Sequence, residues 1–140
     1  MKKKLKCILL VDDDDATNFI NRKIIERVGI AEHIEIKLNG KEAIDYIIKS
    51  DDNKKDSPVP SLILLDINMP IMDGWGFLER YSALENHKKK QIILVMLSTS
   101  LNPEDKRRAE AIPEISDYVY KPLTAEVIHD VFIKHFPDHH

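Results

Sequence analysis

The 140 residues fit a single domain, and 43% of them are hydrophobic, which is enough for a sizeable buried core. Charged residues make up 32% of the chain and the formal net charge is −3, so the composition does not favour a nucleic-acid-binding protein. The single cysteine, Cys7, excludes an internal disulfide and fits a reducing, cytoplasmic compartment.

The N-terminal segment MKKKLKCILLV has the charge pattern of a signal peptide, but its apolar stretch is too short and four aspartates follow it directly. No segment approaches the roughly 18 apolar residues that a membrane helix needs. We therefore expect no signal peptide and no membrane association, and we expect Cys7 to be a small buried hydrophobe.

Short apolar runs alternate with amphipathic stretches along the chain. The apolar runs predict strands at residues 7–11, 33–38, 62–66, 91–97 and 115–120. The amphipathic stretches predict helices at residues 16–28, 41–49, 75–84 and from 125 towards 136. A short polar helix is expected at residues 103–112, because proline and two acidic residues follow Asn102.

The first helix carries signals at both ends. Asp15 is expected to cap its start, and Gly29 is expected to follow its last turn. Ile20, Ile24 and Val28 recur every four residues, which predicts that they form the buried stripe of this helix.

The later elements are expected to follow the same rules. The second helix should bury four apolar residues, Ala43, Ile44, Ile47 and Ile48. Residues 50–60 are polar and contain prolines, which predicts a loop, and the basic segment 87–90 is expected to be a solvated connector. Asn102 and Thr124 are suited to cap the last two helices.

Five strand–helix repeats predict parallel βαβ units with right-handed crossovers. For this length we expect a three-layer, doubly wound α/β fold with a five-stranded parallel sheet in the flavodoxin-like order 2-1-3-4-5. The glycine-rich motifs GxGxxG and GxxxxGK[ST] are absent, which removes the usual signal for a dinucleotide or nucleoside triphosphate site.

Polar residues stand at the ends of four strands that this order makes neighbours. They are Asp12 and Asp13 after the first strand, Asp66 on the third, Ser98 and Thr99 on the fourth, and Lys121 after the fifth. Three close carboxylates repel one another, so either some of them hold protons above the reference pKa or a cation binds. Hard Mg²⁺ prefers oxygen ligands, and the chain has no Cys or His cluster that would favour zinc.

A carboxylate beside a bound cation can act as a nucleophile. Asp66 attacking a phosphoryl group would form an aspartyl phosphate. The ammonium of Lys121 would neutralise charge on the phosphoryl oxygens during transfer.

The segments LLVDDD, LLDINMPIMDG, VMLSTS and YVYKP resemble the response-regulator receiver domain (CheY-like) of two-component signalling, from about Lys6 to Phe136. The resemblance implies a signalling domain rather than an enzyme. Asp66 would accept a phosphoryl group from a sensor histidine kinase or a histidine phosphotransfer protein. Lys121 would contact the phosphoryl oxygens.

The resemblance also implies a Mg²⁺ (or Mn²⁺) site, held by Asp12, Asp13, Asp66 and the backbone carbonyl of Asn68. In the family, a Ser or Thr at the end of the fourth strand moves to the phosphoryl group and an aromatic residue of the fifth strand turns inward. Ser98 and Tyr118 match these positions, although Thr99 is an adjacent candidate hydroxyl. The fourth helix, fifth strand and fifth helix would then bind a target or a second copy of the chain.

Thr99 stands where the family usually has a smaller residue, so we expect it to restrict access and slow self-dephosphorylation. After Phe136 no linker and no DNA-reading motif follow. The expectation is therefore a stand-alone receiver over residues 1–140, with no output domain.

Two other functions remain to be weighed. Asp13, Asp15 and Thr17 match the DxDxT motif of haloacid-dehalogenase-type phosphatases, but that reading leaves Asp66 unexplained and finds no acidic pair after Lys121. A flavin-binding electron carrier would share the fold class, but the chain lacks a phosphate-binding Ser/Thr/Gly loop after the first strand.

Overall fold

The computed structural model describes residues 3–139, without the side chains of residues 86 and 87. Within this range the strands form one parallel sheet in the order β2-β1-β3-β4-β5, as predicted. The strands are β1 (Ile8–Val11), β2 (Ile34–Lys37), β3 (Leu62–Asp66), β4 (Ile93–Ser98) and β5 (Asp117–Tyr120). The fold is therefore the flavodoxin-like α/β fold that the strand–helix alternation predicts.

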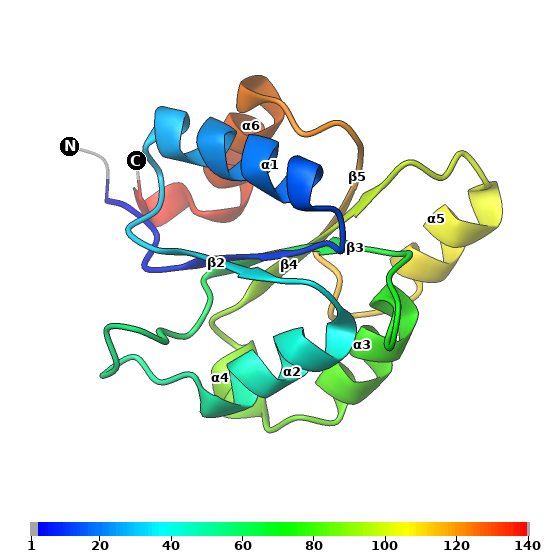
Figure 1. The fold of residues 1–140 in the computed structure, drawn as a ribbon, viewed down its shortest axis with the longest axis horizontal. Helices are drawn as coiled ribbons and strands as arrows, with labels where there is room; N and C mark the ends of the chain where they lie inside the picture. The colour runs from blue at the N-terminus through cyan, green and yellow to red at the C-terminus, as the bar shows by residue number, and fades with distance from the viewer. Residues whose placement is uncertain (1–2, 140) are drawn as a thin grey trace.

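Helices cover both faces of the sheet (Figure 1). They are α1 (Asp15–Val28), α2 (Gly40–Lys49), α3 (Gly74–Ser82), α4 (Asn86–Lys89), α5 (Pro103–Glu110) and α6 (Ala125–His135), followed by the short 3₁₀ helix η1 (Pro137–His139). α1 and α6 lie on one face, whereas α2, α3 and α4 lie on the other (Figure 1). No helix in the described range is long and apolar enough to cross a membrane.

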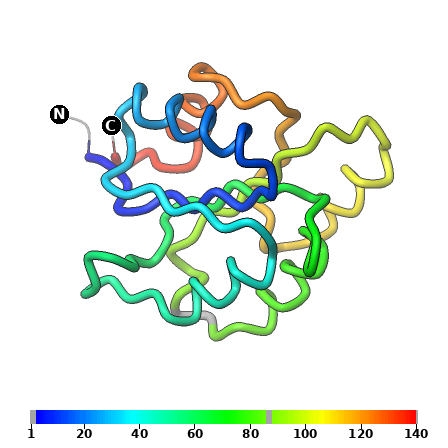
Figure 2. The backbone as a smooth tube through the Cα atoms, in the orientation of Figure 1, coloured from blue at the N-terminus to red at the C-terminus, as the bar shows by residue number. Residues whose placement is uncertain are grey.

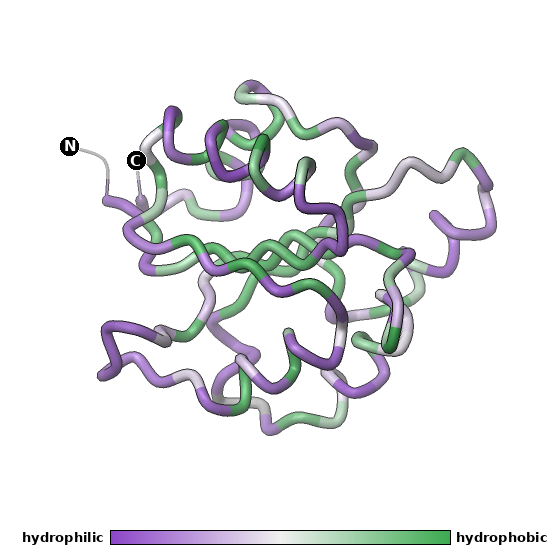
Figure 3. Tube along the Cα trace, viewed as in Figure 1, coloured by the Kyte–Doolittle hydropathy of each residue, from purple (hydrophilic) through white to green (hydrophobic). Residues whose placement is uncertain are grey.

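The central strands are buried on both sides, which explains why their sequences are apolar without alternation. In β1, Leu9 and Val11 pack into the core beneath α2 and α3, whereas Ile8 and Leu10 pack into the core beneath α1 and α6. Figure 3 shows this as a hydrophobic sheet between helices whose outer turns are polar. Cys7 is also fully buried, and burial raises the pKa of its thiol to about 12.

The first helix differs from expectation at its start and along its stripe. Asp14, and not Asp15, is the N-cap, because its side chain accepts the backbone N–H of Thr17. Ile20 was predicted to be buried, but it is 56% exposed. Ile24 and Val28 are partly buried and pack against the core, as predicted, whereas the buried positions of the helix are Asn18, Asn21 and Ile25. Apolar periodicity does not predict this buried face, because two of its residues are asparagines.

The second helix buries Ala43, Ile44 and Ile47 as predicted, but Ile48 is 54% exposed. Tyr46 takes the inward position instead, and its hydroxyl donates to the carbonyl of Pro58 at 2.7 Å. This bond ties the polar loop that follows α2 to the core.

The basic segment 87–90 is more than a solvated connector. Lys88 Nζ donates to the carbonyl oxygens of Ile47, Ile48 and Ser50 at 3.0, 2.8 and 2.8 Å. These carbonyls lie in the last turn of α2 and at its C-cap, Ser50, so the Lys88 ammonium caps the negative dipole end of the helix. Lys89 Nζ similarly donates to the carbonyl of Ser82. The expectation of a solvated surface is therefore wrong for these two lysines, and the His87 side chain lies outside the described residues.

Replacing Lys88 with methionine should lower the free energy of unfolding by about 1–3 kcal/mol, because three carbonyls lose a charged donor. Urea denaturation at neutral pH would measure the change. Lys90, which is exposed, gives the matched control. Its methionine variant should stay within about 0.5 kcal/mol of the parent. Equal effects at the two positions would refute the capping role.

Candidate functional site

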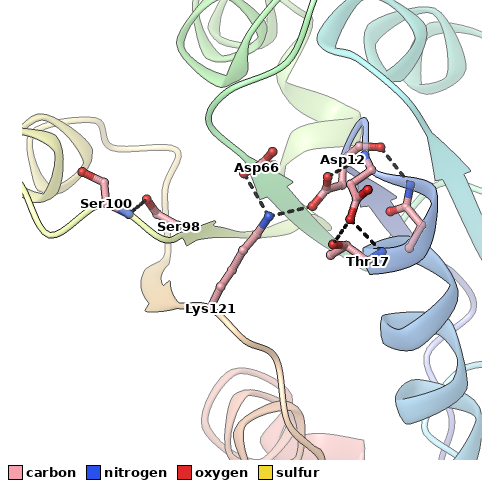
Figure 4. A network of polar contacts seen from close by, with 8 residues as sticks. Asp12, Thr17, Asp66, Ser98, Ser100 and Lys121 are labelled. Atoms are coloured by element: carbon pink, nitrogen blue, oxygen red, sulfur yellow. Dashed lines mark hydrogen bonds and ion pairs between the residues drawn. The ribbon is translucent and has the colours of Figure 1, made fainter.

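Charged residues that were predicted at strand ends lie together at the carboxyl edge of the sheet. Asp12 follows β1 directly, Asp66 is the last residue of β3, and Lys121 follows β5. In Figure 4 the Lys121 side chain extends across the edge and ends between the two aspartates. The parallel sheet therefore brings together three side chains that lie more than 50 residues apart in the sequence.

Lys121 bridges two carboxylates. Its Nζ lies 2.7 Å from Asp12 Oδ2 and 3.1 Å from Asp66 Oδ1. Burial alone would lower the pKa of Lys121, but the hydrogen bond to Asp12 and the charge of Asp66 outweigh it and raise the pKa. The ammonium is therefore firmly charged and held at the carboxyl edge of the sheet.

Asp66 is partly buried, and that burial raises the pKa of its carboxyl above its ordinary value. The negative charge of Asp12 raises it further, and Lys121 offsets only part of this increase. The charges at this edge are therefore not fully balanced by the residues of the described chain.

Carboxylate oxygens of Asp12, Asp13 and Asp66 lie within 4.8 Å of one another. Asp12 is buried and Asp13 is exposed, so the cluster opens to solvent on one side. An all-oxygen cluster with excess negative charge suits a hard divalent cation that keeps several waters. The residues therefore fit a magnesium-type site, in which three carboxylates face one ammonium, that of Lys121.

The Asp12 carboxylate is oriented from its own loop. The backbone N–H of Asp14 donates to Asp12 Oδ1 at 2.9 Å, and Asn18 Nδ2 donates to the Asp12 carbonyl at 2.8 Å. Asn18 is 2% exposed, and its Oδ1 has no hydrogen-bond partner among the described residues. This positioning residue was missed by the sequence analysis, because asparagine inside a helix carries no apolar signal.

The loop after β3 approaches its own strand closely. Gly74 N–H donates to the carbonyl of Ile67 at 2.7 Å, and a Cβ at Gly74 would lie 2.5 Å from the Asp66 carbonyl oxygen. Asn68 lies in this loop and is exposed. Ile71 has φ 69° and is 81% exposed, so the loop holds an unusual backbone conformation without burying that side chain.

Gly74→Ala should destabilise the protein by about 1–3 kcal/mol, because the new methyl group meets rigid backbone at the end of β3. Thermal unfolding would measure the loss. Gly76→Ala is the control, since its Cβ would meet the flexible Met72 side chain at 3.0 Å. A Gly74 variant as stable as the Gly76 variant would contradict the close approach.

The two candidate hydroxyls at the end of β4 differ in environment. Ser98 is 3% exposed and its Oγ accepts the backbone N–H of Ser100 at 2.9 Å, whereas Thr99 is exposed. Figure 4 shows Ser98 and Ser100 apart from the Lys121 cluster. Of the predicted site residues, the structure thus brings together Asp12, Asp13, Asp66 and Lys121, and it leaves the hydroxyls to one side.

Tyr118, the predicted aromatic switch residue, lies on the edge strand β5 and is partly buried. Its hydroxyl is buried and makes no hydrogen bond within the described range. Its ring meets that of Tyr120 edge-on, with 5.6 Å between centroids. The Tyr118 hydroxyl therefore has no polar contact to lose if the side chain turns.

The chain is similar in sequence to known signalling proteins. Residues 8–133 match the family model of the response regulator receiver domain. The probable methanogenesis regulatory protein FilR2 of Methanothrix harundinacea is 33% identical over 85% of this chain and 74% of its own length. The response regulator Rcp1 of Synechocystis is 33% identical over 71% of this chain and 66% of its own length.

A solved structure agrees with these matches. The crystal structure of a two-component response regulator from Cytophaga hutchinsonii superposes with a TM-score of 0.83 and 34% identity, over 94% of this chain and 97% of that one. The fold of that structure therefore agrees with the family that the sequence matches indicate. The chain belongs to the response regulator receiver domain family of two-component signalling.

Proposed function

We propose that the chain is a phosphorelay receiver in which Asp66 accepts a phosphoryl group from a histidine kinase or a histidine phosphotransfer protein. The observation that carries the proposal is the Lys121 ammonium, 3.1 Å from Asp66 Oδ1 at the carboxyl edge of the sheet. A nucleophilic carboxylate next to a fixed positive charge is the arrangement that phosphoryl transfer requires.

The chemistry would run as an in-line displacement. An Asp66 carboxylate oxygen attacks phosphorus, the phosphorus–nitrogen bond of the donor histidine breaks, and the imidazole leaves with its electron pair. Lys121 contacts the phosphoryl oxygens as negative charge spreads over them, and this contact stabilises the transition state. The ammonium needs only a small movement to make it. Because Lys121 already lies between Asp12 and Asp66, it can exchange a carboxylate contact for a phosphoryl contact.

Asp12, Asp13, Asp66 and the backbone carbonyl of Asn68 would hold Mg²⁺ or Mn²⁺. The cation, when bound, neutralises charge on the acceptor and on the transferring group. The close carboxylate oxygens of the three aspartates support this set.

The donor is expected to be a protein because the acceptor edge carries exposed apolar side chains. Phe19 at the start of α1, Ile71 after β3 and Leu101 after β4 are 61%, 81% and 87% exposed. Apolar residues around a charged centre are typical of surfaces that another protein covers.

Phosphorylation would then change contacts elsewhere on the surface. Ser98 would turn towards the phosphoryl group and Tyr118 would turn further inward, which would break no hydrogen bond of the Tyr118 hydroxyl among the described residues. The predicted fourth and fifth helices are α5 and α6, because α4 is an extra single turn. A downstream target, or a second copy of the chain, would bind over α5, β5 and α6.

Intact-protein mass spectrometry tests the proposal. After incubation with acetyl phosphate and Mg²⁺, the protein should gain one phosphoryl group, and EDTA should prevent the gain. Peptide mapping should place the group on Asp66. An adduct on Asp13 would refute the proposal and favour the phosphatase alternative.

Thr99 is proposed to shield the acyl phosphate from water. Thr99→Ala should therefore shorten the lifetime of the phosphoryl adduct severalfold, measured as loss of the adduct mass after removal of the donor. Ser116→Ala, an exposed position away from this edge, is the control. A parent lifetime of only seconds, or an unchanged lifetime in the Thr99 variant, would count against shielding.

A further inference from the structure

α5 is held to the rest of the protein by few side chains. Its sequence, PEDKRRAE, is polar, and Ala109 is its only buried residue. In Figure 1 the helix extends outward beside the sheet, on the side of the β4 carboxyl end. A helix with so little buried surface can shift at low cost, so the few contacts that do hold it determine where it lies.

Besides the buried Ala109, two polar side-chain contacts join α5 to the rest of the protein. Ser100 Oγ donates to Asp105 Oδ2 in the first turn at 2.6 Å. In the last turn, the Arg108 guanidinium stacks over the ring of Trp75 on α3, 4.3 Å from the ring centroid. A stacked guanidinium and a charge-assisted hydrogen bond are both favourable, and both depend closely on geometry.

Ser100 joins α5 to the end of β4 through both of its donors. Its backbone N–H donates to Ser98 Oγ at 2.9 Å, and its hydroxyl donates to Asp105. The Ser100 Oγ also accepts the backbone N–H of Asn102 at 3.2 Å. A short chain of hydrogen bonds thus runs from the buried Ser98 hydroxyl to the first turn of α5, and Figure 4 shows its first link.

We propose that Ser100 is the residue that couples the state of Ser98 to the position of α5. The inference rests on the proposed function, in which Ser98 turns to a phosphoryl group on Asp66. When Ser98 turns, the Ser100 N–H loses its acceptor and the segment before α5 rearranges. The bond from Ser100 to Asp105 then carries the displacement into α5 and moves Arg108 away from Trp75.

Ser100 acts here as a positioning residue that touches neither the donor nor the acceptor. The serine side chain has a single rotatable bond before the hydroxyl, so the hydroxyl moves with the Ser100 backbone. Its hydrogen bond to Asp105 then moves the carboxylate with it. The coupling is a two-state change in a defined set of contacts, which both the acceptor and α5 bias.

The chain carries its own reporter of this change. Trp75 is the only tryptophan of the 140 residues. Because Arg108 lies against its ring, the fluorescence of the unlabelled protein should respond when α5 moves. An Arg108→Ala variant establishes how much of the response comes from this contact.

The experiment measures adduct mass and tryptophan emission on the same samples, before and after Mg²⁺ with acetyl phosphate. A parallel set receives Mg²⁺ with beryllium fluoride, a phosphoryl analogue that binds a carboxylate without group transfer. The variants are Ser100→Ala, Ser100→Thr and Asp105→Ala. Ser116→Ala is the matched serine control.

We expect the parent, Ser100→Thr and Ser116→Ala to show the emission change. Ser100→Ala and Asp105→Ala should acquire the phosphoryl group but lose most of that change, while their resting emission stays like that of the parent. The threonine variant keeps the hydroxyl, so it separates the hydrogen bond from a general effect of substitution.

Three results from the variants would overturn the inference: a full emission change in Ser100→Ala, a resting emission of Ser100→Ala already like that of the phosphorylated parent, or a failure of Ser100→Thr to respond. A parent that gains the phosphoryl group with no emission change would also overturn it, and the proposed function would stand. A parent with neither an adduct nor a response to beryllium fluoride would refute the proposed function, and the inference would fall with it.

Discussion

Asp66→Ala should abolish the phosphoryl adduct that acetyl phosphate and Mg²⁺ produce, with no detectable gain of mass at any incubation time. The carboxylate is the bond-forming group, so its removal leaves no slower version of the same reaction. Asp66→Asn is the companion variant, because it keeps the size of the side chain and the contact region of Lys121. Circular dichroism would establish that both variants fold.

Asp13→Ala separates the acceptor from the metal site. Asp13 is exposed, so its replacement leaves no buried charge unpaired. The variant should still form an adduct on Asp66, but it should need more Mg²⁺ to do so, because one carboxylate ligand is lost. An adduct that persists in Asp66→Ala, or that disappears only in Asp13→Ala, would overturn the assignment of the acceptor.

Lys121→Ala should slow phosphorylation by about 10²–10³-fold, the range seen when one preorganised charge-stabilising group is removed from an active site. The rate of adduct formation at saturating Mg²⁺ measures the effect. Lys134→Ala is the control, since that lysine is also ion-paired but its side chain is 66% exposed and lies on α6. Comparable slowing by the two variants would show that the effect comes from general charge.

The same variant has a second readout that does not involve phosphoryl transfer. Lys121 is the charge partner of the buried Asp12 carboxylate, so its loss leaves that carboxylate without a counter-charge. Lys121→Ala should therefore unfold at a lower temperature than the parent in EDTA, and Mg²⁺ should restore part of the difference. If Mg²⁺ stabilised parent and variant equally, Lys121 and the cation would not share the same carboxylates.

The positions of the charged site residues could be predicted because parallel topology fixes where strand ends meet. Once the order 2-1-3-4-5 was inferred, Asp12, Asp66 and Lys121 had to share an edge. The side-chain directions did not follow from that order. Whether the ammonium lies between two carboxylates, or points to solvent, depends on burial and repulsion that only the folded structure defines.

Two of the sequence predictions failed because polar residues make hydrogen bonds inside the protein. Asn18 holds the Asp12 carbonyl, and Lys88 caps α2 from a segment about 40 residues later in the chain. Such residues are polar and do not recur at a regular interval along the sequence, so hydrophobic periodicity assigns them to the surface. Ile20 and Ile48 show the opposite error: periodicity predicts that both are buried, but both are exposed because they lie beside the buried face of their helix.

The two ends of the described chain run side by side, with Lys3 N–H donating to the His139 carbonyl at 2.9 Å, and they lie across the molecule from the α5 side (Figure 2). A circular permutant should therefore be attainable, with a short glycine–serine linker joining the ends and new termini opened in the polar loop at residues 51–57. Immobilisation through either end would leave the acceptor edge facing away from the support. Surface-based binding assays with candidate donors could then use either orientation of attachment.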